Sequence, residues 1–310
     1  MPTWNELLNE VESLKPDKVA PWIEQNLQDR LEEISDLRGG SNVLLYASAF
    51  LQKPGAPAPL LQITREEVNG FMSMLHGMTW EDGLTLILHT PGGIPDATET
   101  IVDYLWSKFD DVEVIVPTYA MSAGTMISLA ATRIVMGRQS QLGPIDPQMP
   151  VGNGNRSVSA RAITEQFERA ETEIIGNQQK AHVWAPILQS LGPALLQEAE
   201  DALDYGTNMV SEWLEGEMFS DREDAAEKAE EVAEYFKSSQ HKSHGRRIDK
   251  HEAESQGLEV ESLEDDQELQ EAVLTAYHIV TIAFEKGPMT KMLINDSARS
   301  WIKNVPQPTN

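Results

Sequence analysis

The stretch "VPTYAMSAGTMISLAATRIVMG", residues 116–137, predicts the end of a buried strand, a tight turn at Ser122, an apolar helix and a further strand. Its small neighbours Ala123 and Gly124 leave the serine hydroxyl open, and the Ala123 amide would point out of the helix N-terminus toward a developing negative charge. This follows the logic of a nucleophile elbow, with A-x-S-x-G in place of G-x-S-x-G. The commonest role of a serine before a helix is that of an N-cap, so both interpretations stay open on these residues alone.

Compact apolar runs alternate with helical periodicity around this stretch. The runs have the length and composition of buried strands, and they cover residues 43–50, 84–90, 112–120 and 133–137. Helical segments separate them along the chain. This alternation predicts parallel βαβ units and an α/β fold whose sheet is covered on both faces.

Helical patterns dominate the two ends of the chain. We expect four segments: an N-terminal helical segment (1–40), a catalytic core (41–150), a helical extension that completes the core (151–290) and a tail (291–310). The sequence contains no internal repeat and no Gly/Ser-rich linker. One domain with helical additions is therefore the simplest organisation.

A second unusual loop, "HTPGG" at residues 89–93, ends the strand that precedes the strand leading to Ser122. Ligand sites of open α/β sheets lie beyond the carboxyl ends of the strands, so the two loops should be neighbours in space. Gly92 and Gly93 lack a Cβ, so their amides can approach a ligand oxygen closely and donate to an oxyanion. An ordinary strand-to-helix turn would explain "PGG" alone, but the pair of loops favours acyl-transfer chemistry.

The composition limits the classes of partner. Lys and Arg total 24 against 50 Asp and Glu, a net charge of −26, which disfavours binding to nucleic acid or to an anionic membrane. The chain has no cysteine, which excludes disulfides and a cysteine nucleophile and fits a reducing cytoplasm. Nothing in residues 1–19 resembles a signal peptide, and the sequence contains no apolar run of about 18 residues, no H-E-x-x-H and no P-loop. We therefore expect a soluble intracellular protein with no membrane span, no metal and no cofactor.

Three motifs in a fixed order carry a family resemblance: H-T-P-G-G at 89–93, S-A-G at 122–124 and L-G-P-I-D-P-Q at 142–148. With their flanking residues they resemble the Clp-protease/crotonase superfamily. They look most like the serine dehydrogenase proteinase family, relatives of signal peptide peptidase A and of the NfeD-type serine proteases. The resemblance implies a ClpP/crotonase-like spiral of ββα units, a peptide or protein substrate and assembly into a homo-oligomer.

The resemblance also implies roles for single residues. Ser122 would be the nucleophile. The amides of Ala123 and of Gly93, or of Gly92, would form the oxyanion hole. These assignments agree with what the two loops suggest by themselves.

The general base is left open by the resemblance, with three candidates. In Clp-type peptidases a histidine follows the serine at a spacing that falls here on Asp146, which would take part in catalysis or brace its loop. In the signal-peptide-peptidase-like branch a lysine lies further along the chain, and Lys180 is the candidate, although "GNQQKAHVW" around it is polar. His244, in the basic turn "KSHGRRI", has a side chain suited to general-base work, or it lies at the surface.

Three functions fit these observations. The leading one is a cytoplasmic serine peptidase with a Ser122 nucleophile and a backbone-amide oxyanion hole. A crotonase-type acyl-CoA enzyme would use the same amides for a thioester, but the serine of S-A-G argues against it. A catalytically degenerate oligomeric scaffold is the third, since no base is secured. Of the other histidines, His89 would reach Ser122 across adjacent strand ends or, as we favour, pack or donate to backbone, and His182 would lie at the surface.

Overall fold

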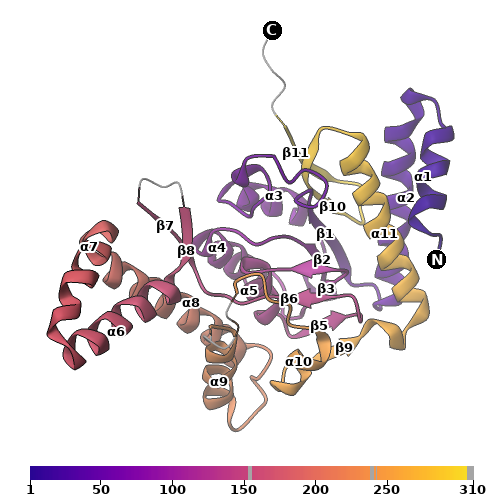
Figure 1. The fold of residues 1–310 in the computed structure, drawn as a ribbon. Coiled ribbons are helices and arrows are strands. Elements are labelled where there is room, and N and C mark those ends of the chain that lie inside the picture. Colours follow the sequence, from indigo (N-terminus) through magenta and orange to yellow (C-terminus); the bar gives the residue numbers. More distant parts are fainter. Residues whose placement is uncertain (153–155, 238–240, 242, 306–310) are drawn as a thin grey trace.

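The computed structural model describes residues 1–152, 156–237, 241 and 243–305, and it has the predicted α/β fold. A mixed seven-stranded sheet forms its centre, in the order β11-β10-β1-β2-β3-β5-β9 (Figure 1). The strands are β1 (Asn42–Ser48), β2 (Leu84–His89), β3 (Val112–Val116), β5 (Arg133–Met136), β9 (Val260–Ser262), β10 (Met289–Asn295) and β11 (Ser300–Asn304). Strands β1, β2, β3, β5 and β9 are parallel, whereas β10 and β11 pair antiparallel.

Apolar side chains fill both faces of the sheet. Two rows cross the central strands, one on each face: Leu44, Leu86 and Val114 in the first, and Leu45, Ile87 and Ile115 in the second. All six side chains are buried. Continuous apolar runs are typical of parallel strands that are covered on both sides, which is why these segments form the sheet.

Helices cover the two faces (Figure 1). One layer consists of α1 (Trp4–Ser13), α2 (Pro16–Leu37) and α11 (Gln267–Lys286). The other consists of α3 (Glu66–Leu75), α4 (Pro95–Trp106) and α5 (Ala123–Leu129), extended by α8 (Leu195–Gly216) and α9 (Ala225–Lys237). Within the described ranges, none of the helices combines the length and the apolar character needed to cross a bilayer.

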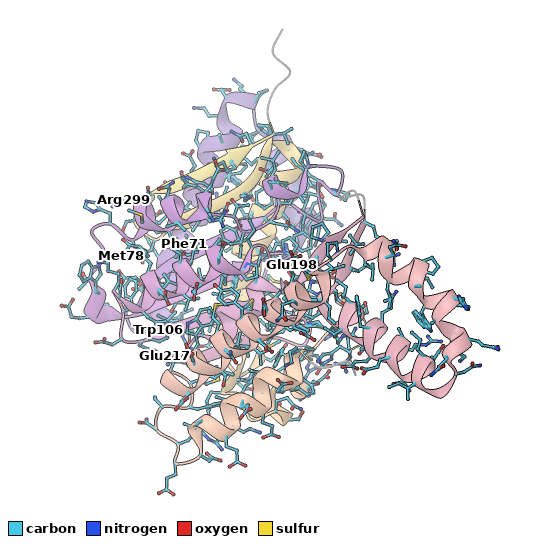
Figure 2. The ribbon with its side chains drawn as sticks, turned by 90° about the vertical axis from the view of Figure 1, so that its left-hand side faces the viewer. Phe71, Met78, Trp106, Glu198, Glu217 and Arg299 are labelled. Atoms are coloured by element: carbon cyan, nitrogen blue, oxygen red, sulfur yellow. The ribbon has the colours of Figure 1, made fainter. Side chains whose placement is uncertain are left out.

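A helical arm projects from this body. The hairpin of β7 (Gln148–Val151) and β8 (Arg156–Ser159) leads into α6 (Ala160–Gly176), α7 (Ala181–Leu191) and the first part of α8. These helices have a small core of their own. They stand away from the sheet in Figure 1, and Figure 2 shows the same arm extending beyond the body in the side view. No residue of α7 is buried.

The C-terminal segment differs from the expected tail over 291–310. Strands β10 and β11 occupy half of it, and β10 pairs antiparallel with β1. Without β10, the edge of β1 would be left unpaired beside an apolar core. The short run around Leu293 was missed because polar residues flank it, Lys291 and Asn295, and both are buried in the fold. The other predicted segment boundaries remain a proposal.

Candidate active site

The two glycine- and serine-bearing loops touch at the carboxyl edge of the sheet. An isolated parallel bridge joins Thr90 to Ala120. A Cβ placed on Gly92 would lie 2.7 Å from the Ser122 Cβ and 3.1 Å from the Ala123 nitrogen. Gly92 also has a φ of 104°, in the left-handed region that favours glycine. The loops therefore pack backbone against backbone, at a distance that leaves no room for a side chain.

The backbone of Ser122 is strained. Its φ is 51° and its ψ is −114°, values that a serine rarely adopts. Its side chain makes no capping bond to α5 among the described residues, although Ser122 occupies the N-cap position. Strain of this kind costs about 1–3 kcal/mol and persists where the surrounding structure holds it, often at functional sites. The geometry thus favours an elbow over a helix cap.

Two backbone amides beside Ser122 have no acceptor within the described part of the chain: the N–H groups of Gly93 and Ala123. The N–H of Gly92 donates to Thr90 Oγ1 at 3.1 Å and is therefore occupied. Unpaired backbone donors are uncommon, and two of them at one serine suit the binding of an oxyanion. Of the two glycines expected from the sequence, Gly93 is the one whose N–H has no acceptor among the described residues.

Short backbone pairings bring three distant segments together at this edge. β4 (Tyr119–Ala120) pairs in parallel with β6 (Gln141–Leu142). Leu142 in turn exchanges two hydrogen bonds with Ile248, of 2.9 Å and 3.0 Å. As a result the residues that follow β4, those that follow β6 and those that precede Ile248 lie side by side.

These three segments carry Ser122, Asp146 and His244. The His244 Nδ1 lies 2.7 Å from Asp146 Oδ1, and a carboxylate accepts, so Nδ1 donates. Asp146 is buried and His244 is half-buried. The Asp146 loop is held against the serine turn, because the Gly143 N–H donates to Thr125 Oγ1 at 2.9 Å and that hydroxyl donates to the Ala120 carbonyl at 2.7 Å.

A hydrogen-bonded turn presents His244. The Arg246 N–H donates to the Ser243 carbonyl at 3.1 Å and closes the turn. The Arg246 guanidinium donates to Nδ1 of buried His241 at 2.7 Å and pairs with Glu252 at 2.6 Å. The second ring nitrogen of His241 then donates to a carbonyl of α9 at 2.6 Å. Burial lowers the pKa of His241, which keeps the ring neutral and able to accept from the arginine.

The other sequence candidates lie elsewhere. Lys180 is exposed on the arm, and its Nζ is 3.3 Å from Glu173. His89 is buried, with its Nδ1 3.0 Å from Thr118 Oγ1, and burial lowers its pKa to about 3. His182 is exposed on α7. The structure brings none of these three to the Asp146–His244 pair.

Sequence reasoning missed several residues that build the site. Thr90 stands just before the glycines of its loop and Thr125 just after the serine turn, and a threonine at such a turn is a signal for a side-chain bond to backbone. Arg246 lies beside His244 in the basic turn, and its side-chain partners His241 and Glu252 lie within six residues of it. Their nearness in the sequence does not by itself show that the three side chains meet.

The family follows from comparison with known proteins. The family model described as ClpP-like SDH-type serine proteinase matches residues 63–277. The chain belongs to this family. The match includes both loops, Asp146 and the His244 turn. It supports a serine proteinase at the level of the family, while the roles of single residues remain proposals.

Three known proteins illustrate the range of similarity. Two are uncharacterized proteins of Methanocaldococcus jannaschii, one 34% identical over 120 residues and the other 46% identical over 66 residues. These alignments cover 38% and 21% of this chain, and 42% and 23% of the relatives' own length. The third is a solved structure of the 1510-N membrane-bound stomatin-specific protease, a mutant in complex with a substrate peptide. It is 20% identical with a TM-score of 0.41, covering 67% of this chain and 74% of that one.

Proposed function

We propose that the protein is a serine peptidase in which Ser122 is the nucleophile, His244 the general base and Asp146 the group that orients the base. The observation that carries this proposal is the 2.7 Å hydrogen bond between Asp146 and His244, on segments paired with the strained Ser122 turn. Serine, histidine and carboxylate recur in this relation on unrelated folds and in different chain orders. Membership of a serine proteinase family supports the same reaction class.

The proposed mechanism uses the tautomer that the hydrogen bond dictates. With the Nδ1 proton donated to Asp146, Nε2 of His244 holds a lone pair and takes the hydroxyl proton as Ser122 Oγ attacks the peptide carbonyl carbon. The amides of Gly93 and Ala123 stabilise the oxyanion. The tetrahedral intermediate then breaks its C–N bond, and His244 gives the proton to the leaving amine. Water repeats the sequence on the acyl-enzyme and releases Ser122.

A fluorophosphonate probe tests this assignment, because an activated serine hydroxyl displaces its fluoride and becomes phosphonylated. We expect the wild-type protein to be labelled and the Ser122→Ala variant to be unlabelled. His244→Ala should be labelled about 10³-fold more slowly or worse, since the base is lost. Lys180→Ala is the matched control and should be labelled at the wild-type rate.

Each other outcome contradicts a part of the proposal. Labelling that persists in Ser122→Ala would place the nucleophile elsewhere. Loss of labelling in Lys180→Ala but not in His244→Ala would identify Lys180, on the arm, as the general base. A folded wild-type protein that is never labelled would favour a catalytically degenerate scaffold.

We also propose a homo-oligomer that acts on peptide or protein substrates, with the arm as the contact surface. Ile175 and Val183 on this arm are 76% and 63% exposed, and exposed apolar patches mark protein interfaces. Light scattering should give a smaller mass for the double variant Ile175→Glu/Val183→Glu than for the wild type. Met72→Glu, which changes an exposed apolar residue on α3, should keep the wild-type mass. An unchanged mass in the arm variant would exclude this interface. The cytoplasmic setting stays a prediction from the sequence.

A further inference from the structure

A fully buried ion pair lies apart from the proposed triad. Lys291 of β10 and Glu67 of α3 have side chains only 1% and 0% exposed, and Nζ is 2.5 Å from Oε1. Removing two charges from water costs several kcal/mol per ion, so a buried pair is often no more stabilising than apolar residues of the same volume. Stability alone is therefore a weak explanation for this pair.

The remaining hydrogen bonds of the pair go to the backbone on either side of Ile63. Lys291 Nζ donates to the Gln62 carbonyl at 2.6 Å. Glu67 Oε2 accepts from the Thr64 N–H at 2.6 Å and from the Thr64 hydroxyl at 2.8 Å. The residue before Ile63 and the residue after it are thus both anchored to the same ion pair.

Ile63 in turn forms backbone hydrogen bonds with the loop that carries the proposed oxyanion donor. Its N–H donates to the Gly92 carbonyl at 2.9 Å, and its carbonyl accepts from the Ile94 N–H at 2.9 Å. A Cβ on Gly93 would lie 2.1 Å from the Ile63 oxygen, so the two backbones are in direct contact. This parallel bridge spans both peptide groups of Gly93.

The planarity of one peptide group links the hydrogen bonds of Ile63 to the direction of the proposed oxyanion donor. The Gly92 carbonyl and the Gly93 N–H belong to the same trans peptide, so they point in opposite directions. Because the carbonyl is held toward Ile63, the Gly93 N–H is held away from Ile63. Any rotation of this peptide would break the bond from the Ile63 N–H.

We propose that the buried Lys291–Glu67 pair is a positioning device for the oxyanion hole: it fixes the 62–64 backbone, which fixes the direction of the Gly93 N–H. The inference rests on the proposed function, since it assigns a catalytic consequence to the direction of that amide. Lys291 and Glu67 act through Ile63 and do not touch the reacting atoms.

The test replaces both charges together, so that no unpaired charge is left buried. Loss of a full oxyanion donor costs about 10²–10³ in kcat, so a loosened donor in Glu67→Gln/Lys291→Met should cost about tenfold or more in kcat and in the fluorophosphonate labelling rate. KM for a peptide substrate should change less than twofold, roughly, because the donor acts mainly in the transition state. A peptide boronate, which mimics the tetrahedral intermediate, should lose affinity in proportion to kcat.

A matched control separates positioning from stability. Arg38→Met breaks another largely buried ion pair, that of Arg38 with Glu113, which lies at the opposite end of the strands. This variant should lose stability, but its folded molecules should keep the wild-type labelling rate. Wild-type kcat and boronate affinity in the double variant would overturn the inference.

Amide hydrogen exchange distinguishes this inference from the proposed function. Exchange in residues 90–94, measured in the Ser122→Ala background, should be faster in the double variant and unchanged in Arg38→Met. Unchanged exchange in the double variant would show that the ion pair does not fix the backbone of residues 90–94, even if the protein is a peptidase. A different result would be faster exchange in the double variant while the fluorophosphonate never labels the wild-type protein. That result would refute the catalytic assignment together with the proposed function.

Discussion

Adding one methyl group at Gly92 would create a steric clash with Ser122, the proposed nucleophile. The new Cβ would lie 2.7 Å from both the Met121 oxygen and the Ser122 Cβ. Ordinary non-bonded separations are about 3.5–4.0 Å between carbon atoms, so the two loops must separate by about 0.8–1.3 Å. A misplacement of about 1 Å can cost about 10²-fold in rate. We therefore expect Gly92→Ala to be labelled by the fluorophosphonate about 10- to 100-fold more slowly than the wild type.

The stability of Gly92→Ala divides into two parts that a control can separate. A φ of 104° costs an alanine about 1–2 kcal/mol, and overpacking adds about 1–3 kcal/mol. Gly39 also has a positive φ, of 72°, but a Cβ there would meet nothing within 4 Å. Urea denaturation should thus show a larger loss for Gly92→Ala than for Gly39→Ala, and Gly39→Ala should keep the wild-type labelling rate. Equal labelling of the two variants would refute the claim that close packing of the loops positions Ser122.

Three further predictions concern the histidines. Asp146→Asn keeps the shape of the side chain but loses the charge that orients His244, and kcat should fall by about 10³–10⁴. Arg246→Met keeps the backbone N–H that closes the turn but removes the guanidinium that binds His241 and Glu252, so kcat should fall about tenfold or more with little change in KM. Burial lowers the pKa of His89 to about 3, so the unfolded chain takes up its proton near pH 6.5 while the folded chain does not. Stability is then lost as the pH falls, and between pH 7.5 and pH 5 the wild type should lose about 2 kcal/mol more than His89→Phe.

Steady-state kinetics on a peptide substrate check the first two predictions. An Asp146→Asn variant with wild-type kcat would exclude an orienting role, and an Arg246→Met variant that changes KM alone would exclude the turn as a positioning element. Denaturation at several pH values checks the third. Parallel stability curves for the wild type and His89→Phe would show that the buried ring takes up a proton in the folded state.

Much of the fold was predictable because its determinants are local. The apolar runs that became β1, β2, β3 and β5 are long enough to be recognised, and the helices between them have clear periodicity. The failure at β10 has a physical cause. Lys291 is hidden by an ion pair with Glu67, a partner far away in the sequence, and no local pattern distinguishes a buried lysine from an exposed one.

The candidate site was predictable in part for the same reason. Two consecutive strands end in marked loops, so contact between "HTPGG" and "AMSAG" follows from parallel topology. The Asp146–His244 pair does not follow, because it depends on the bridge between Leu142 and Ile248. That bridge joins segments separated by the whole arm. The sequence could therefore name both residues as candidates but could not pair them.

The separation of the paired segments also sets an order of events during synthesis. A ribosome that has finished α9 has already made Ser122 and Asp146, but not His244. The contacts that fix the Gly93 peptide need Lys291 as well, which is made later than His244. On the proposed mechanism, an incomplete chain holds a serine that nothing activates. On that mechanism the site is complete only after β10 has been made and has paired in the sheet, so a chain that lacks β10 would not cleave its own copies or neighbouring nascent proteins.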